Sequence, residues 1–447
     1  MLNAWVSQRA SRCGNLHIAT RVTPAGASLQ DGLSQARKSA LLGGAAALAG
    51  LLTCTGAQAQ CTDNFNYAFF TGPTFGGPSA GLGSVISSVS TINTVNTAFL
   101  TSSSAFVSSP PGPKPDQQSG GIWGRAVGGV VDTTTSSTTT LTVTGLTGTP
   151  TPAVGQAHCV TKDRQTFAGA QFGYDLAKLN NDGTGANFHF GTTFGYLQAF
   201  TKDTTPAAVY SNPTFGNETS PAGTAKETTK VPFVGLYANY TQGHFFADAM
   251  YRVDFYQNSI TDSLQGIDGL SQNARGYSLT GNVGYNMPLA GGWFIEPAGG
   301  IILSRVQADS LALPKFGTLP VGNAVQIDTI DSALGRASVS VGKNISSGGV
   351  IWQPYVTVGI VHEFAGDIGV TQTSGPISTT AGPLCNPCLA TDTFNTSIER
   401  IGTYGQYTAG TAVVLGNTGW LGYGRVDYRK GDTIEGVSGN VGLRYQW

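Results

Sequence analysis

Apolar and polar side chains alternate along the last residues of the chain, 436–447. Successive side chains of an extended strand point to opposite faces, so residues two apart share a face. One face carries Val437, Val441, Leu443, Tyr445 and Trp447 together with Gly439, and the other carries Ser438, Asn440, Gly442, Arg444 and Gln446. The pattern predicts a β-strand with one apolar face and one polar, charged face.

Segments of this character recur from Gly120 to the C-terminus, and they are rich in Tyr, Phe, Val, Thr and Gly. Each is at least as long as the ~9–11 residues that a tilted membrane strand requires. We expect twelve strands, at about residues 120–131, 164–176, 187–199, 230–241, 243–256, 274–287, 293–307, 332–345, 351–365, 402–415, 420–430 and 436–447.

The expected connections differ in length according to their order. Those after odd-numbered strands are long, at 132–163, 200–229, 257–273, 308–331 and 366–401, except for the short 431–435. Those after even-numbered strands are short, at 180–185, 242–243, 288–292, 346–349 and 417–418. A soluble β-sandwich also alternates apolar and polar residues, but nothing in it sorts loops by length. Outer-membrane barrels have short periplasmic turns and long extracellular loops, which fits this order.

The fold class predicted is therefore all-β, a 12-stranded antiparallel up-and-down transmembrane β-barrel over residues 120–447. The short turns lie on the side of Trp447, which we expect to be periplasmic. The long connections are polar and low in charge, and Thr133–Thr140 consists almost entirely of Thr and Ser. We expect these connections to be solvated loops.

Composition agrees with a barrel better than with several soluble domains. Charged residues make up 11% of the chain, against roughly 25% in ordinary soluble domains. Mean hydropathy is −0.02, and no segment of the expected mature chain reaches the ~18 consecutive apolar residues of a transmembrane helix. A net charge of −1 and the lack of a basic cluster argue against nucleic acid as a partner.

The N-terminal residues have the order of a secretory signal peptide. Arg37 and Lys38 precede an apolar run at 40–52, and Ala57 and Ala59 occupy the two small-residue positions that a signal peptidase reads. We expect residues 1–59 to be removed, so that Gln60 becomes the first residue. The alternatives are a single membrane anchor and, less well supported, a lipoprotein at Cys54. The leader before Arg37 is long, which leaves open a start codon downstream of Met1.

An amphipathic helix is expected just ahead of the barrel, within residues 84–119; residues 60–83 then form a short exported segment. Its apolar residues recur at three- and four-residue spacing: Val85, Ile86, Val89, Ile92, Val95 and Phe99. The Pro-rich stretch 110–115 ends the helix as a stiff connector. We expect this slim, uncharged helix inside the pore. Its weak helix propensity keeps open a helix on the periplasmic surface or a disordered segment.

Neither a metal, a cofactor nor catalysis is expected. Cys385 and Cys388 are candidates for a small disulfide in an oxidising compartment, and two ligands without a His pair do not make a metal site. No His belongs to a recognisable nucleophile motif. Charges on the polar strand faces are expected to fill the lumen as ion pairs: Asp248, Arg252, Asp254, Glu296, Arg305, Arg336, Glu363, Arg425, Asp427 and Arg444.

Three stretches together resemble the autotransporter β-domain family, the translocators of type V secretion. They are residues 120–125 (GGIWGR), 170–176 (AQFGYDL) and the terminal 441–447 (VGLRYQW). The last resembles the C-terminal signal, ending in an aromatic residue, that the barrel-assembly machinery reads; here it consists of Val441, Leu443, Tyr445 and Trp447. The resemblance covers about residues 84–447, and the order of the stretches is more specific than any one of them.

The resemblance implies a 12-stranded barrel with a helix in its pore, located in the outer membrane after export through the periplasm. It implies as partners the outer-membrane lipid bilayer, the secretion translocon and the barrel-assembly machinery, with the barrel a monomer. The chain departs from the family in its N-terminal segment, which is much shorter than a usual passenger. The expected function is a translocator barrel that displays this segment and its long loops. The alternatives are a porin-like channel or passive surface or adhesion barrel, and a lipid-active enzyme.

Overall fold

The computed structural model describes residues 61–63, 90–99, 113–144, 153–212, 216–220, 222–263, 267–313, 322–379, 388–416 and 418–447. The chain divides into two units, Met1–Ala57 and Gln58–Trp447. The first unit, with the expected signal peptide, lies outside the described residues. Within the described part of the second unit, none of the helical segments has the length and apolar character to cross a membrane.

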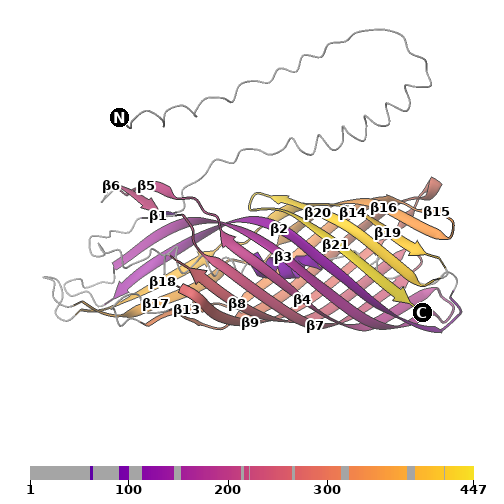
Figure 1. The fold of residues 1–447 in the computed structure, drawn as a ribbon, viewed down its shortest axis with the longest axis horizontal. Coiled ribbons are helices and arrows are strands. Elements are labelled where there is room, and N and C mark those ends of the chain that lie inside the picture. Colours follow the sequence, from indigo (N-terminus) through magenta and orange to yellow (C-terminus); the bar gives the residue numbers. More distant parts are fainter. Residues whose placement is uncertain are drawn as a thin grey trace, which may run out of the picture. The chain divides into compact units, whose positions relative to one another are not determined.

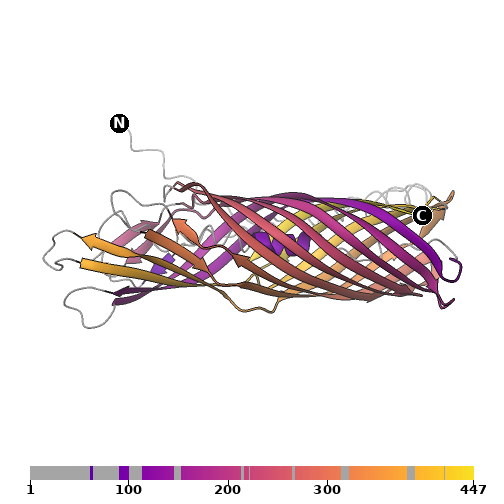
Figure 2. The same ribbon diagram turned by 90° about the horizontal axis from the view of Figure 1, so that it is seen from below.

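Twelve long strands form a closed antiparallel barrel (Figures 1 and 2). They are β2 (Gln117–Thr144), β3 (Ala153–Asn181), β4 (Ala186–Asp203), β7 (Lys226–Gln242), β8 (Phe245–Asp262), β9 (Ile267–Tyr285), β11 (Trp293–Ala308), β14 (Ile330–Lys343), β16 (Val350–Glu363), β19 (Thr403–Leu415), β20 (Trp420–Gly431) and β21 (Ile434–Gln446). Each strand pairs with the next one in this order. The predicted fold class is confirmed.

The barrel closes between its first and last long strands. β2 pairs with β21 antiparallel, in a register that runs from Gly121 opposite Gln446 to Thr133 opposite Ile434. No strand edge is therefore left open over this length, which is what a sheet in a membrane requires, because lipid cannot satisfy backbone hydrogen bonds. We call the end with Trp447 the C-terminal end and the opposite end, where β2 and β3 meet, the hairpin end.

The expected solvated loops at the hairpin end are largely strands, and the prediction of a loop at Thr133–Thr140 is wrong. β2 continues through Thr144 and pairs with β3 as far as Val143 opposite Ala153. Thr is β-branched and favours extended backbone, so a Thr-rich stretch extends a strand when a partner strand lies beside it.

Further short strands lengthen the same wall. They are β12 (Leu311–Leu313), β13 (Gly322–Ile327), β17 (Ile368–Thr379) and β18 (Cys388–Ile398). β17 pairs with β13 and with β18, and β18 pairs with β2. The remaining short elements are β1 (Cys61–Asp63), β5 (Ala208–Asn212), β6 (Gly216–Ser220), β10 (Met287–Pro288), η3 (Ala290–Gly292) and β15 (Ile345–Ser347).

The connections at the C-terminal end are short, as predicted from their order. Between β3 and β4 only residues 182–185 leave the strands, and Asp182, Gly183 and Gly185 there have positive φ. Between β7 and β8 the chain turns at Gly243, again with a positive φ. Glycine adopts this left-handed conformation without steric cost, which is why tight hairpins use it.

The outer face of the wall is apolar and the inner face is polar, which is the reverse of the arrangement in a soluble protein. Large apolar side chains point outward and are exposed, for example Phe190 (61%), Val358 (59%) and Val441 (59%). Inward positions are polar and buried, for example Gln171 (0%) and Arg252 (2%). A continuous apolar outer surface of this extent is stable in lipid and aggregates in water.

Aromatic side chains gather near both margins of the apolar surface. Those at the C-terminal end include Tyr285, Trp293, Trp352, Trp420, Tyr445 and Trp447. Trp420 packs on Tyr445 with ring centroids 4.9 Å apart, and Tyr407 packs on Tyr428 nearer the hairpin end at 6.2 Å. Aromatic rings prefer the interface between lipid and water, so these two bands mark the limits of the membrane-embedded wall.

Inward-facing aromatic rings cover inward-facing glycines on neighbouring strands. A Cβ atom at Gly173 would lie 2.3 Å from Cε2 of Trp123, and one at Gly195 would lie 2.3 Å from Cζ of Phe233. The glycines therefore leave room for the rings, which fill the lumen side of the wall.

We predict that Gly173→Ala lowers the free energy of unfolding by about 1–3 kcal/mol, the usual cost of overpacking. The Trp123 ring has little freedom to move aside, because its Nε1 donates a 2.7 Å hydrogen bond to the Tyr237 hydroxyl. Urea unfolding in detergent micelles measures the effect. Gly439→Ala is the matched control, since its Cβ would meet nothing closer than a backbone oxygen at 4.0 Å. Equal stability of the two variants would refute this account of the packing.

Candidate functional site

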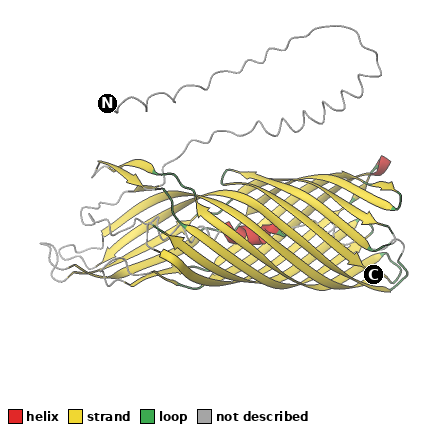
Figure 3. Ribbon diagram, in the orientation of Figure 1, coloured by secondary structure: helices red, strands yellow, loops and turns green. Residues whose placement is uncertain are grey.

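The helix at residues 90–98 lies inside the barrel, where Figure 3 shows it in red behind the strands of the wall. Ile92, Val95 and Phe99 of the predicted apolar stripe are buried, with Phe99 just past the helix end. Val85, Ile86 and Val89 lie outside the described residues. Most polar residues of the helix are buried as well, namely Ser90, Thr91, Thr94, Asn96 and Thr97, and Asn93 is half-buried. A helix covered on both its apolar and its polar sides is enclosed by the wall.

Polar contacts join the helix to four different strands. Gln165 of β3 donates to the Thr91 hydroxyl at 2.7 Å and is also hydrogen-bonded to Thr94. On the other strands, Asn96 donates to Ser304 of β11 at 2.8 Å, Arg252 of β8 donates to the Val95 carbonyl oxygen at 3.2 Å, and Arg429 of β20 donates to the Thr97 hydroxyl at 2.9 Å. Because these strands surround the lumen, the helix is held from several sides.

Aromatic and cationic side chains surround the C-terminal end of the helix. The Phe99 ring packs against Phe233 of β7 with centroids 5.3 Å apart. The Arg125 guanidinium lies 5.4 Å from the Phe99 centroid, and the Arg252 guanidinium lies 5.0 Å from that of Phe233. Cation–π contacts of this kind strengthen where water is excluded, so they fasten a helix whose own propensity is weak.

The helix has a definite direction in the lumen. Thr91 and Thr94 are level with Gln165 on β3, whereas Phe99 is level with Arg125 on β2, which stands opposite Gln171 of β3. Gln165 is nearer than Gln171 to the hairpin end of β3. The N-terminus of the helix therefore points toward the hairpin end, and its C-terminus points toward the C-terminal end, where β2 begins.

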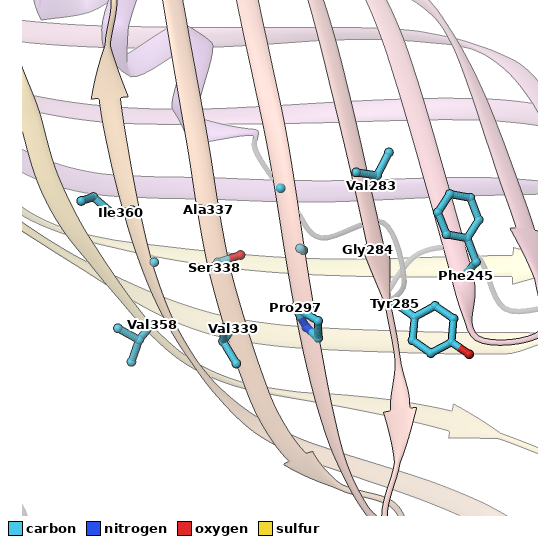
Figure 4. A pocket seen from close by; sticks show the side chains of 13 residues that line it. Phe245, Val283, Gly284, Tyr285, Pro297, Ala337, Ser338, Val339, Val358 and Ile360 are labelled. Atoms are coloured by element: carbon cyan, nitrogen blue, oxygen red, sulfur yellow. The ribbon is translucent and has the colours of Figure 1, made fainter.

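One small cavity is found beside the described part of the helix. A cavity of about 10 Å³ lies against Thr91 and Ile92, between Tyr256, Asn258 and Gln272, and this is room for about one water molecule. A larger hollow of about 720 Å³ lies on the outer surface, lined by Val283, Val339, Val358 and Ile360 (Figure 4). Small residues such as Gly299 and Ala337 open this second space on the apolar face.

A buried network joins the last strand to the first strands nearer the C-terminal end. Arg444 of β21 donates two hydrogen bonds to the Asp175 carboxylate of β3, at 2.7 and 2.8 Å. His189 of β4 lies 3.0 Å from the same carboxylate, and the Tyr237 hydroxyl of β7 donates to it at 2.8 Å. The Arg444 and Asp175 side chains are 1% and 0% exposed. This group, the seam network, crosses β2 and so spans the place where the barrel closes.

The structure places most of the predicted lumen charges on the inner face. Arg252 pairs with Asp254 at 2.7 Å, and Asn282 donates to Asp248 at 2.9 Å. Arg425 pairs with Asp427 at 3.2 Å. Glu296, Arg336 and Glu363 also point inward.

Arg305 departs from this pattern, and its assignment to the lumen is wrong. It points outward on β11, 63% exposed, and pairs with Asp331 at 2.6 Å. Its neighbours Ser304 and Val306 take the inward positions on either side. Arg305 lies beyond the apolar outer surface toward the hairpin end, where water rather than lipid solvates the pair.

The other predicted site residues have these positions. Val441, Leu443, Tyr445 and Trp447 of the expected assembly signal point outward from the end of the chain. Ala57, Ala59, Gln60 and Cys385 lie outside the described residues. Cys388 begins β18, but its side chain lies outside the described residues, so the expected pairing with Cys385 stays a prediction.

Sequence reasoning missed several residues that contact the helix or form the seam network: Arg125, Gln165, Asp175, His189, Phe233, Tyr237 and Arg429. The alternation of side chains along each strand would have placed most of them on the inner face, because they share a face with other polar positions. This alternation does not tell which inward residues contact one another, because those contacts depend on the register between strands. Among the described residues there is no group of His, Cys, Asp and Glu arranged to hold a metal ion.

Comparison with known proteins adds to this geometry. The family model for the autotransporter beta-domain matches residues 122–384. A probable autotransporter of Escherichia coli K12, YcgV, is 27% identical over 146 residues, which is 31% of this chain and 15% of that protein. The autotransporter CRAC of Citrobacter rodentium is 25% identical over 220 residues, covering 47% and 12%. The chain thus spans only a small part of these relatives.

A solved structure has the same fold. The transport unit of the autotransporter AIDA-I from Escherichia coli superposes with a TM-score of 0.54 at 17% identity, covering 82% of this chain and 98% of that one. At this identity the likeness concerns the fold alone.

Proposed function

This chain belongs to the autotransporter β-domain family, and from that premise we propose that it displays an N-terminal segment and its long hairpins at the cell surface. Its location as an outer-membrane barrel follows from the family and the fold. What the proposal adds is the orientation, and the passage of the N-terminal segment through the lumen.

The direction of the helix is the observation that carries the proposal. Its N-terminus points toward the hairpin end, and β1 pairs with β3 at Ala157–Cys159, beyond the level of Gln165. The chain therefore has residues on the hairpin side both in β1 and at the start of the helix, and it re-enters the wall at β2 from the C-terminal end. This is the arrangement expected if the N-terminal segment has passed outward through the pore.

The two ends of the barrel support the orientation. Short turns and the C-terminus share one end, which is the periplasmic end in barrels of this kind. The long hairpins β2–β3 and β17–β18 share the other. We further propose that the barrel-assembly machinery reads the outward residues of β21, and that the secretion translocon and the outer-membrane bilayer are the remaining partners of a monomeric barrel.

An epitope tag inserted directly after Gln60 tests the proposal in intact cells. We expect antibody to bind without permeabilisation, because the tag would lie on the hairpin side. A tag between Gly183 and Thr184 is the matched control: it lies in the β3–β4 turn and should be reached only after the outer membrane is opened. Binding at the turn but not after Gln60 in intact cells would reverse the orientation, and binding at neither would refute display of the segment.

A further inference from the structure

We propose that Cys61 and Cys159 form a disulfide that fastens the exported N-terminal segment to the outer end of β3; its outer location rests on the proposed function. Cys159 is disulfide-bonded and 3% exposed. Its Cα partner across the antiparallel pair of β1 and β3 is Cys61. Directly opposed residues of such a pair lie about 4.5–5.5 Å apart at Cα, within the range that a disulfide bridges.

The register of the wall excludes Cys388 as the partner. Ser137 of β2 stands opposite both Cys159 of β3 and Ile398 of β18. Cys388 is at the other end of β18, and a strand rises about 3.3 Å per residue. It is therefore roughly 30 Å from the level of Cys159, against a limit of about 7 Å for a disulfide.

Cys385 is excluded by its distance along the chain. It precedes Cys388 by three residues, and such a stretch reaches at most about 11 Å. It cannot return to the level of Cys159. Of the cysteines that follow the expected cleavage site, only Cys61 remains within reach.

The bond closes a covalent ring that contains the lumen helix. The ring runs along the chain from Cys61 through the helix at 90–98 and through β2 into β3, as far as Cys159. The helix is then anchored on the C-terminal side by its continuation into β2 and on the hairpin side by the disulfide. Its non-covalent contacts with the wall, such as those with Gln165 and Ser304, can break and re-form, whereas the covalent ring prevents withdrawal of the segment through the pore even when they are broken.

Formation of the bond needs an oxidant, which we take to be a disulfide of the thiol–disulfide exchange system of the cell envelope. One cysteine thiolate attacks that disulfide and forms a mixed disulfide; the second cysteine then displaces the reduced oxidant. The S–S bond of the oxidant breaks, one forms between Cys61 and Cys159, and two electrons and two protons pass to the oxidant.

Peptide mapping of the full chain, isolated from outer membranes with free thiols blocked by alkylation, tests the pairing. Trypsin cuts after Arg125 and Lys162 and is blocked at Lys114 by Pro115. Cys61 and Cys159 therefore fall on different peptides, ending at Arg125 and at Lys162. We expect the two peptides to be linked without reductant and separate after reduction.

Variants make the assignment specific. Cys61→Ser should leave Cys159 alkylated, Cys159→Ser should leave Cys61 alkylated, and a Cys385→Ser, Cys388→Ser double variant should keep the link. Alkylated Cys61 in the unchanged chain, or a link from Cys159 to the peptide holding Cys385 and Cys388, would overturn the pairing. The epitope tag after Gln60 distinguishes failure of the disulfide from failure of the proposed function. A tag that antibody reaches in intact cells, in a chain without the Cys61–Cys159 link, refutes the disulfide alone. A Cys61–Cys159 link in a chain whose tag antibody does not reach refutes display of the segment.

Discussion

Arg444→Met is expected to lower the free energy of unfolding of the barrel by about 3–5 kcal/mol. The substitution removes the cation and leaves the Asp175 carboxylate buried at 0% exposure, with only His189 and Tyr237 beside it. Breaking a buried pair is costly because the remaining charge has lost both water and its counterion. The pair also joins β21 to β3 across β2, so its loss acts at the seam of the closed wall.

The measurement is urea unfolding of protein refolded in detergent micelles, followed by the different mobilities of folded and unfolded barrel on cold electrophoresis. Lys430→Met is the matched control. Lys430 pairs with Glu435 at 2.6 Å within the β20–β21 hairpin, but both side chains are more than 40% exposed. An exposed pair contributes about 0–1 kcal/mol, so this variant should unfold close to the unchanged protein.

A double variant separates a charge effect from a packing effect. Asp175→Asn added to Arg444→Met removes the uncompensated carboxylate while keeping an acceptor for His189 and Tyr237. We expect it to recover part of the lost stability, since the coupling of two contacting residues appears as non-additivity. If the two single losses simply add, the seam network does not act through the Arg444–Asp175 charge pair.

The strands of the barrel wall could be predicted because the sequence pattern of each strand lies within that strand. Period-two alternation in segments such as 436–447 can be read without knowing any partner strand, and all the long strands occur where it predicts them. Strand ends at the hairpin end were not predictable from composition. The Thr and Ser residues at 133–140 suit either a solvated loop or an extended strand, and the partner β3 decides between them.

The lumen was predictable only in part, for a related reason. The three- and four-residue spacing of Ile92, Val95 and Phe99 predicts a helix, and the structure buries all three in the pore. The contacts that hold it come from residues far along the chain: Arg429 meets Thr97, and Arg444 meets Asp175. Such contacts depend on register and closure, which no single segment encodes.

Removal of residues 61–99 is expected to raise single-channel conductance several-fold in planar bilayers. In the unchanged protein the helix is held by β3, β8, β11 and β20 at once, and the described cavity against Thr91 and Ile92 has a volume of about 10 Å³. Ions must keep much of their hydration shell to pass, and this space holds about one water molecule. Without the helix the polar inner face, including Gln165 and Arg252, would line a wet lumen.

Two controls decide whether the helix itself is the plug. The truncated barrel must show the electrophoretic mobility of the folded state, so that leakage from unfolded protein is excluded. An Asn96→Ala, Thr97→Ala variant keeps the helix but removes its hydrogen bonds to Ser304 and Arg429; it should show brief openings, because Ile92, Val95 and Phe99 still hold the helix in place. Equal conductance of the truncated and unchanged barrels would show that the helix does not plug the lumen. The plug would then be refuted, and the porin-like alternative would be supported.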